Sequence, residues 1–222
     1  MTSPPTSISE LRVALFSGNY NYVRDGANKA QNRLVGTLLD HGAQVRVYAP
    51  TVAEPAFEPT GPLVSLPSVP LPGRSEFHMP LSLSRQARAD LEAFDPHVLH
   101  ISSPDRAARQ AAAWARRRGI PVVCTIHTRF ETYPRYYGLG FVEPLVVVWL
   151  RRLYARCDTL LVPSPTMVGV MREQRMNPSV EIWSRGVEKD VFHPGARDLG
   201  WRRKLGLEDE LPVIGFLGRL VL

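Results

Sequence analysis

Short apolar runs alternate with longer amphipathic patterns along most of this 222-residue chain. Residues 11–16, 121–126 and 158–162 have the length and composition of buried strands, whereas 27–41 places apolar side chains three and four residues apart, as a helix does. Strands that are apolar on both faces need helices on both sides of the sheet. The alternation therefore predicts an α/β fold, a parallel sheet with helices on both faces.

The same patterns predict the other elements. The remaining expected strands are 44–49, 63–66, 97–101 and 180–183, and the remaining expected helices are 83–94, 105–118, 141–156, 165–173 and 196–205. Residues 50–80 are rich in proline and, apart from the strand at 63–66, are predicted to be loop. Residues 211–217 predict a further buried parallel strand, which needs neighbouring strands and crossover helices. Because none of these follows before Leu222, we expect this strand to open a second, truncated lobe.

The elements divide the chain into four expected parts. Residues 1–10 are a disordered or flexible N-terminus, 11–185 form a Rossmann-like lobe, 186–210 are an interlobe linker and helix, and 211–222 hold the first strand of the second lobe. The linker is expected after the last strand of the first lobe, where strand and helix patterns stop.

Composition narrows the class of protein. The N-terminus lacks the basic and apolar regions of a signal peptide, and the longest apolar run, 144–150, is far shorter than the roughly 18 residues of a membrane span. Cys124 and Cys157 lie in apolar surroundings without a metal-binding spacing, so we expect two reduced thiols and no metal site. These features predict a cytoplasmic protein.

Basic residues give the chain a net charge of +6 and gather at 116–118, 151–152 and 202–204. One interpretation is solvated helix surface. The other is contact with an anionic substrate or with an anionic membrane surface, where the protein would be peripheral on the inner face. Residues 146–150 fit either a membrane-facing helix or core packed against the sheet. We expect no nucleic-acid partner, because no recognised nucleic-acid module is visible.

In open parallel sheets, ligands bind outside the carboxyl ends of the strands, which selects three loops. The first, 17–29, enters a helix whose N-terminal amides can hold an anion. Asp25 is a good N-cap, and Gly26 lets a ligand approach the backbone closely. The loop lacks the GxGxxG fingerprint of a dinucleotide site. Its other ligand-facing candidates are Tyr22, Arg24 and Lys29.

The other two loops follow the strands at 97–101 and 121–126. In the earlier loop, Ser102 or Ser103 is expected to cap the next helix. The later loop is the richest in polar groups and begins with His127, at the place in the sheet that favours a site. Arg129, Arg135 and Glu131 can instead form local ion pairs, which contribute little to stability when exposed. The candidates for hydroxyl-rich or anionic ligands here are Arg129, Glu131, Tyr133 and Tyr136.

These loops, in this order, resemble the N-terminal lobe of the GT-B glycosyltransferases of family 4. The matching pieces are GNYNYVRDGANKAQNRLVGTLLDHGAQVRVYAP, HISSPD, CTIHTRFETYPRYY, LLVPSPTMVGVM, IWSRGVEKDVFHP and VIGFLGRL, which span nearly the whole chain from Leu11. The histidine and tyrosines of the third loop, together with W-x-x-G-V…F-x-P, are most similar to members that glycosylate lipids, such as sulfoquinovosyl-diacylglycerol synthases and phosphatidylinositol mannosyltransferases.

The resemblance implies retaining transfer of a hexose from a GDP- or UDP-sugar to a lipid or small-molecule hydroxyl, with no cofactor and no required metal. It implies that the lobe at 11–185 binds the acceptor and that the missing lobe mainly binds the donor. Asp25 and Gly26 match the turn that approaches the donor phosphates, and Arg219 matches an arginine that holds the diphosphate. His127 matches an active-site histidine that positions the sugar, and Arg185-Gly186 leads to the interlobe linker. The residues assigned to the acceptor side are Tyr22, Arg24, Lys29, Ser103, Arg129, Glu131, Tyr133 and Tyr136.

The chain departs from the family pattern in two places. Asp25-Gly26 stands where many members have Gly-Gly, and the lysine and acidic motif that complete the donor site do not occur before Leu222. The resemblance therefore implies little or no transferase activity for this chain alone. Three alternatives stay open: a nucleotide-sugar epimerase of similar build, a non-catalytic lobe that binds sugar, lipid or a partner, and a dinucleotide-binding domain. The sequence shows no clear acid cluster for the first and no glycine fingerprint for the third.

Overall fold

Seven parallel strands form one sheet in the structure, a computed structural model that describes residues 4–71 and 74–215. The strand order is β3-β2-β1-β6-β7-β8-β9, and every neighbouring pair is parallel. The order reverses between β1 and β6, so the switch point, where open α/β sheets bind ligands, lies there. The strands are β1 (Arg12–Phe16), β2 (Gln44–Ala49), β3 (Leu63–Ser65), β6 (Val98–Ile101), β7 (Val122–Thr125), β8 (Thr159–Val162) and β9 (Val180–Ile182).

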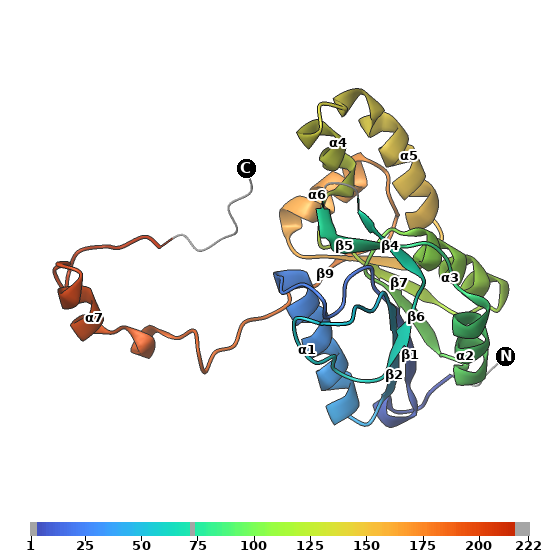
Figure 1. Ribbon diagram of the computed structural model, residues 1–222, viewed down its shortest axis with the longest axis horizontal. Helices are drawn as coiled ribbons and strands as arrows, with labels where there is room; N and C mark the ends of the chain where they lie inside the picture. The colour runs from blue at the N-terminus through green and yellow to red at the C-terminus, as the bar shows by residue number, and fades with distance from the viewer. Residues whose placement is uncertain (1–3, 72–73, 216–222) are drawn as a thin grey trace. The chain divides into compact units, whose positions relative to one another are not determined.

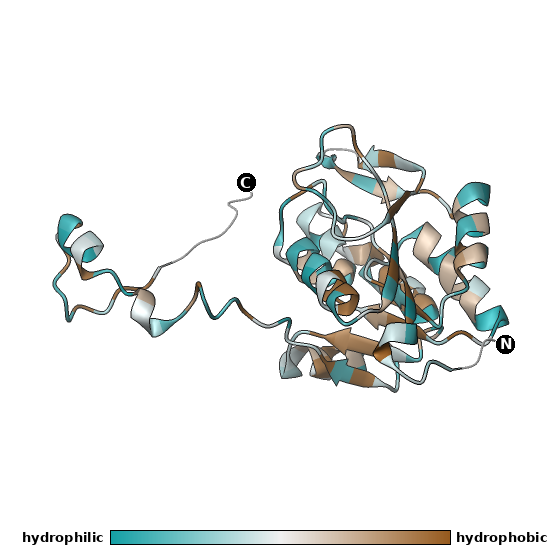
Figure 2. Ribbon diagram, turned by 90° about the horizontal axis from the view of Figure 1, so that it is seen from below, coloured by the Kyte–Doolittle hydropathy of each residue, from teal (hydrophilic) through white to brown (hydrophobic). Residues whose placement is uncertain are grey.

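Helices cover both faces of this sheet (Figure 1). Val13 and Leu15 of β1 belong to an apolar cluster with α1, whereas Ala14 and Phe16 belong to a larger cluster that includes α2, α3, α5 and α6. Figure 2 shows the apolar strands between helices whose outer sides are polar. The predicted parallel α/β fold is therefore confirmed. The helices are α1 (Gly26–Asp40), α2 (Arg85–Phe94), α3 (Arg106–Arg117), α4 (Tyr133–Tyr136), α5 (Glu143–Tyr154) and α6 (Pro165–Glu173).

The region 50–80 is where the sequence prediction fails most. Ser68–Leu71 (β4) and Arg74–Pro80 (β5) form an antiparallel pair whose register is irregular between Pro70 and Leu71. Prolines made this segment resemble loop, because proline has no N–H to donate to a strand partner. A two-stranded ribbon consists only of edges, however, and edges tolerate proline. The expected loop is thus wrong for these two strands.

The chain divides into two compact units, 1–185 and 186–222. The described part of the second unit contains a short 3-10 turn, η4 (Pro194–Ala196), and a short helix, α7 (Leu199–Lys204). The strand predicted at 211–217 is wrong at 211–215, where the backbone is irregular. A parallel strand forms only beside another strand, and among the described residues none pairs with this run. Residues 216 and 217 lie outside the described part of the chain.

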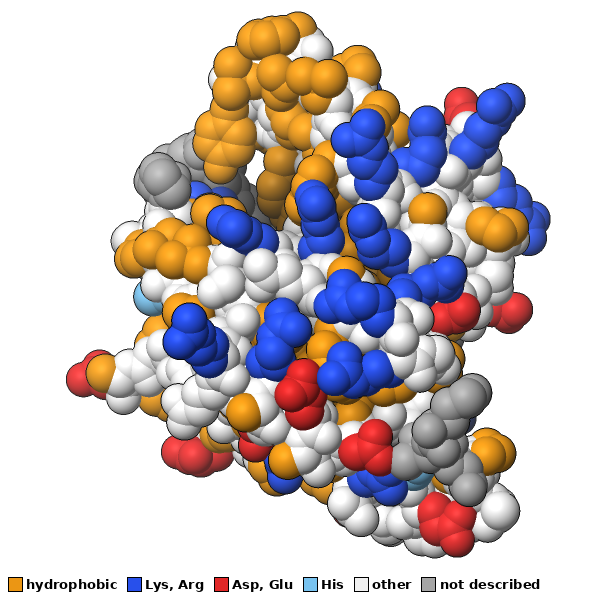
Figure 3. All heavy atoms as spheres, turned by 90° about the vertical axis from the view of Figure 1, so that its right-hand side faces the viewer, with side chains coloured by type: hydrophobic (Ala, Val, Ile, Leu, Met, Phe, Trp, Pro, Cys, Tyr) orange, Lys and Arg blue, Asp and Glu red, His pale blue; other side chains and the backbone are white. Residues whose placement is uncertain are grey.

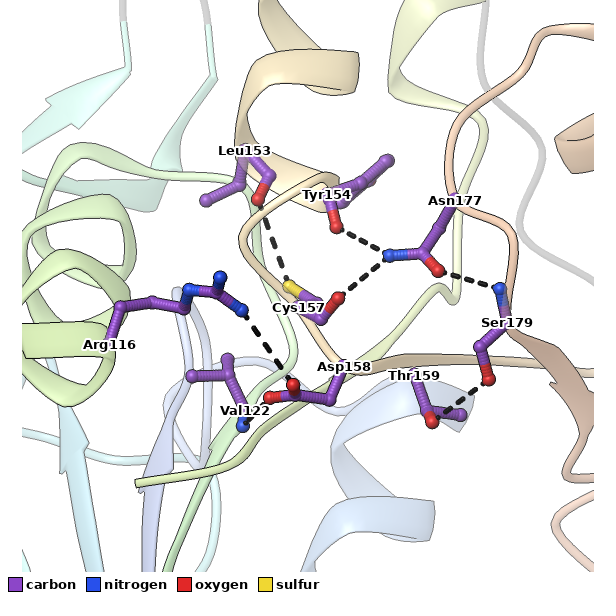
Figure 4. Close-up of polar contacts among 9 residues, drawn as sticks. All are labelled: Arg116, Val122, Leu153, Tyr154, Cys157, Asp158, Thr159, Asn177 and Ser179. Carbon is purple, nitrogen blue, oxygen red and sulfur yellow. Dashed lines mark hydrogen bonds and ion pairs between the residues drawn. The ribbon is translucent and has the colours of Figure 1, made fainter. Parts of the chain in front are cut away.

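Side-chain hydrogen bonds attach the C-terminal end of α5 to the sheet (Figure 4). Asn177 donates through Nδ2 to the carbonyl groups of Tyr154 and Cys157, at 2.8 Å each. The Asp158 carboxylate accepts a hydrogen bond of 2.7 Å from the backbone N–H of Val122. The last carbonyl groups of a helix have no partner within the helix, so these bonds satisfy groups that would otherwise be buried without one. The end of α5 is therefore firmly anchored.

The two cysteines are buried, as predicted, and neither forms a disulfide. A hydrogen bond to Cys157 and burial raise the pKa of the Cys124 thiol well above its ordinary value, so this thiol stays protonated. Across the residues that the structure describes, no helix combines the length and apolar character needed to cross a bilayer.

Candidate functional site

The loop after β1 is held in place by bonds to other parts of the lobe. The Tyr22 hydroxyl lies 2.6 Å from the carbonyl oxygen of Gly18, to which it donates, and accepts a 3.1 Å hydrogen bond from the N–H of His78. Burial raises the pKa of Tyr22 to about 12. The Arg24 guanidinium donates twice to the carbonyl oxygen of Ala56. Both side chains thus support the loop in this structure, and their contact with an acceptor stays a prediction.

Asp25 caps α1, as predicted. Its Oδ1 accepts a 2.8 Å hydrogen bond from the backbone N–H of Asn28. Gly26 is the first residue of α1, and a Cβ added to it would meet no described atom within 4 Å. Lys29 is exposed one turn further on. The backbone is therefore uncrowded at Gly26, where an anionic group can approach the start of this long helix.

The loop after β6 lies against the first loop. A Cβ on Gly18 would stand only 3.1 Å from Cβ and Oγ of Ser103, so glycine permits this close approach. The predicted serine cap is wrong, because Asp105 immediately precedes α3 and its Oδ1 accepts from the N–H of Ala108 at 2.8 Å. Ser103 instead donates to Oδ2 of Asp105 at 2.6 Å. Burial raises the pKa of Asp105 to about 6.

His127, directly beyond β7, is the side chain at this edge that most needs a ligand. Both ring nitrogens are buried, and neither has a hydrogen-bond partner among the described residues. Its ring meets that of Trp183 edge-on, with 6.1 Å between centroids. Burial and the positive charge of Arg185 lower the pKa of His127 to about 3, so the ring is neutral near pH 7. A neutral imidazole can accept one hydrogen bond and donate another, and leaving both unmade is costly.

Arg185 brings positive charge to the same edge of the sheet. It follows β9 and has a left-handed backbone, with φ of 69°. Burial lowers the pKa of its guanidinium, and the carboxylate of Asp25 acts in the opposite direction. Since Arg185 also lowers the pKa of His127, it lies within electrostatic reach of both loops. Arg185 therefore joins residues from three strand ends into one candidate site.

The third loop contains the ion pairs that the sequence offered as an alternative. Arg129 pairs with Glu131 at 2.6 Å, and Glu131 is only 2 % exposed. Arg135 pairs with Glu143 of α5 rather than with Glu131. The loop surface has a hollow of about 480 Å³. The hollow is lined by Thr128, Arg129, Thr132, Tyr133, Arg135 and Tyr136.

The structure places the predicted site residues in several different surroundings. Around the carboxyl ends of the strands it brings together Asp25, Gly26, Ser103, His127 and Arg185. Of the other acceptor-side candidates, Tyr133 and Tyr136 line the hollow, while Glu131 is a buried support. Gly186 belongs to the second compact unit, and Arg219 lies outside the described residues. No cluster of three metal-binding side chains occurs in the part of the chain that the structure describes.

Two residues near the site were missed or misplaced by the sequence prediction. Arg185 was assigned only to the linker segment, although the rule about carboxyl ends of strands applies equally to the strand at 180–182. His78 was missed altogether. Its backbone holds Tyr22 and its ring packs edge-on against that residue at 5.4 Å, but the strand that carries it was predicted to be loop.

Comparisons with known proteins identify the family. Residues 24–191 match the profile of Glycosyltransferase Family 4. A GDP-mannose-dependent alpha-mannosyltransferase from Mycolicibacterium smegmatis is 30% identical over 218 residues, which are 95% of this chain and 56% of that protein. A sulfoquinovosyl transferase from Arabidopsis thaliana is 28% identical over 97% of this chain and 43% of its own length.

A solved structure supports the fold. A sucrose-phosphate synthase from Thermosynechococcus elongatus superposes with a TM-score of 0.60 at 15% identity, covering 91% of this chain and 54% of that one. At this identity the likeness concerns the fold alone. The chain spans about half the length of the relatives it matches.

Proposed function

Because the chain belongs to glycosyltransferase family 4, we propose that the protein transfers a hexose from a GDP- or UDP-sugar to a hydroxyl of a lipid or small-molecule acceptor, with retention of configuration. The names of the two relatives support a nucleotide-sugar donor and transfer of a sugar. The proposal assigns the acceptor side mainly to the lobe at 11–185. The observation that carries it is the half-buried His127 ring, whose two buried nitrogens have no partner among the described residues and which lies within electrostatic reach of Arg185.

Charge stabilisation is the first task of such a site. When the bond from sugar to diphosphate breaks, negative charge builds on the leaving group, and fixed cations and amides placed there lower the barrier. On this chain, Arg185 and the amides that begin α1 at Gly26 are the groups suited to that task. We propose that Arg219 adds to them, and that these groups do the work without a metal ion.

Positioning is the second task. As a neutral ring, His127 can accept a hydrogen bond from one hydroxyl and donate one to another, which suits a sugar better than a charged imidazolium would. In the proposed step, the acceptor oxygen bonds to the anomeric carbon on the face from which the phosphate oxygen departs, and that phosphate oxygen takes the hydroxyl proton. Retention then needs neither a nucleophilic His127 nor the paired carboxylates of retaining hydrolases.

We further propose that the acceptor is a lipid. We place the protein in the cytoplasm, in peripheral contact with the inner face of a membrane. The net charge of +6 supports attraction to an anionic leaflet. Two buried thiols outside any disulfide are what a reducing compartment favours.

The test is nucleotide release by the protein expressed from its complete reading frame. The protein would be incubated with GDP-mannose, UDP-glucose and UDP-sulfoquinovose, each with and without vesicles that contain diacylglycerol and phosphatidylinositol. We expect acceptor-dependent release of GDP or UDP with one donor, and little release by the 222-residue chain tested beside it. Folded protein that releases no nucleotide with any donor would contradict the proposed transfer and favour a binding lobe.

A further inference from the structure

One end of the lobe exposes a continuous run of large apolar side chains. Tyr136 is 81 %, Phe141 77 % and Leu145 70 % exposed, and Tyr137 and Leu139 are exposed between them. We call these five residues the apolar tip. Figure 3 shows apolar side chains gathered at the top of the molecule, at the height where α4 and α5 lie in Figure 1. Single exposed apolar residues are ordinary, but a contiguous group of this size marks an interaction surface.

The exposed apolar side chains of the tip continue along one side of the first turns of α5. Val146, Val147 and Trp149 pack against the core and Leu150 is buried, so the interpretation of 146–150 as core is correct at four of the five positions. The fifth, Val148, is 41 % exposed. Leu145, Val148 and Arg152 stand three and four residues apart, which aligns them along one outward stripe of the helix.

Positive charge follows the apolar side chains along this stripe. Arg151 and Arg152 are both exposed at the end of α5, about 10 Å from Leu145 at the rise of an α-helix. The Arg151 guanidinium donates twice to the carbonyl of Gln174, so Arg152 is the cation of this pair that extends the stripe. The single acidic residue between 133 and 156 is Glu143, which pairs with Arg135. Figure 3 shows many Lys and Arg side chains below the tip on the same view of the molecule.

This order of side chains matches the depth profile of a bilayer surface. Interfacial helices bury apolar groups about 5–10 Å into the boundary between head groups and acyl chains. Tyrosine favours the head-group level, and arginine extends its charge toward the phosphates. We propose that the apolar tip enters the head-group region of an anionic bilayer while Arg152 contacts lipid phosphates. The bordering cations favour this occupant over an apolar protein surface.

The position of the tip suits a lipid-using enzyme. Tyr136 belongs both to the tip and to the lining of the hollow that begins at Thr128, the residue after His127. An acceptor head group could lie in the hollow while its acyl chains stay in the bilayer. That last step rests on the proposed function, whereas docking to the bilayer does not.

The test is co-sedimentation of the complete protein with vesicles of equal parts phosphatidylcholine and phosphatidylglycerol, without nucleotide sugar. We expect binding to these vesicles and much less to phosphatidylcholine alone. Phe141→Glu should weaken binding by about ten-fold or more, because burial of a phenylalanine is lost. Arg152→Gln should weaken it about five-fold at low salt, with a smaller effect at high salt.

Two matched variants control for general effects of the substitutions. Ile8→Glu places the same charge on another exposed apolar residue of the lobe, and Arg33→Gln removes an exposed arginine from α1. Both should bind vesicles as the unchanged protein does. Thermal unfolding of all four variants would show that each is folded.

Three results would overturn the proposal: equal binding to vesicles with and without phosphatidylglycerol, unchanged binding by folded Phe141→Glu, or a dimer that Phe141→Glu converts to monomer. The last would assign the tip to a second copy of the protein. Vesicle binding without nucleotide release would contradict the proposed transfer and leave docking intact. Transfer to a detergent-dispersed acceptor without vesicle binding would contradict docking alone.

Discussion

The loops after β1 and β7 begin at the same edge of the sheet, yet Tyr20 and Asn21 of the first are hydrogen-bonded within the lobe, whereas His127 of the other is not. Asn19 Oδ1 is the one buried side-chain atom of the first loop that lacks a partner among the described residues. In the first loop, the hydroxyl of Tyr20 donates to the carbonyl of Thr60 at 2.7 Å, and the amide of Asn21 donates to that of Phe57 at 3.0 Å. In the other loop, His127 has no partner for either nitrogen within the described residues. Satisfied groups make a fixed scaffold, whereas an unsatisfied buried group is costly unless a ligand completes it.

The scaffold side of this comparison is tested most severely at Asn32 of α1. Its Nδ2 donates to the carbonyl of Tyr20 at 2.9 Å, and its Oδ1 accepts from the N–H of Thr60 at 2.9 Å. Asn32→Ala leaves both backbone groups buried without partners, so we expect the free energy of unfolding to fall by about 3 kcal/mol. Urea unfolding measures this free energy. The control Gln44→Ala, at an exposed position of β2, should change the free energy of unfolding by about 0.5 kcal/mol at most. Equal losses would show that Asn32 does not brace the loop.

The ligand side is tested at His127. His127→Ala should lower kcat/KM of the complete protein about 100-fold, the usual loss when one placed hydrogen-bonding group is removed from a reacting site. Because no hydrogen bond within the described chain is lost, its free energy of unfolding should change by only about 1 kcal/mol. His41→Ala, at the exposed C-cap of α1, should leave kcat/KM unchanged. A variant that loses stability rather than activity would place His127 in the scaffold.

Tyr22 sharpens the comparison, because the sequence predicts it as an acceptor contact and the structure uses it as a brace. Tyr22→Phe keeps the ring but leaves the carbonyl of Gly18 and the N–H of His78 without this partner. We expect the free energy of unfolding to fall by about 1.5 kcal/mol, roughly the cost of one unmet hydrogen bond. The KM for the acceptor should change less than two-fold. A several-fold rise in KM at unchanged stability would restore the acceptor role.

Much of this arrangement could be predicted because local patterns determined it. The strand at 44–49 and the helix at 165–173 were predicted with their observed bounds, since apolar periodicity and the Ser164-Pro165 start identify them without tertiary contacts. The carboxyl-edge rule likewise placed His127 and Asp25 at the site. Both predictions depend on information contained in a few adjacent residues.

The rest depended on contacts between distant segments. The ribbon β4–β5 is held by pairing between its own strands and by Tyr22, and its prolines hide it from propensity arguments. Likewise, nothing local distinguishes the outward Leu145 from the inward Val146 in an unbroken apolar run, because the packing of α5 on the sheet decides it. Arg185 joined the site only when the sheet order placed β9 beside β8.

The smallest expected effect is a change in stability with pH, which tests whether His127 is truly without a partner. Burial lowers its pKa to about 3 in the folded chain, against an ordinary value of about 6.5 when unfolded. Between these values the unfolded state binds more protons, so stability falls as pH falls. At pH 6 the loss from this group is about 0.8 kcal/mol relative to pH 7.5 or above. Urea unfolding of His127→Gln should show a pH dependence smaller by that amount.

If the unchanged protein and His127→Gln lose stability equally, the folded state protonates His127 as readily as the unfolded chain does. The ring would then be solvated, and the contrast between the two loops would disappear.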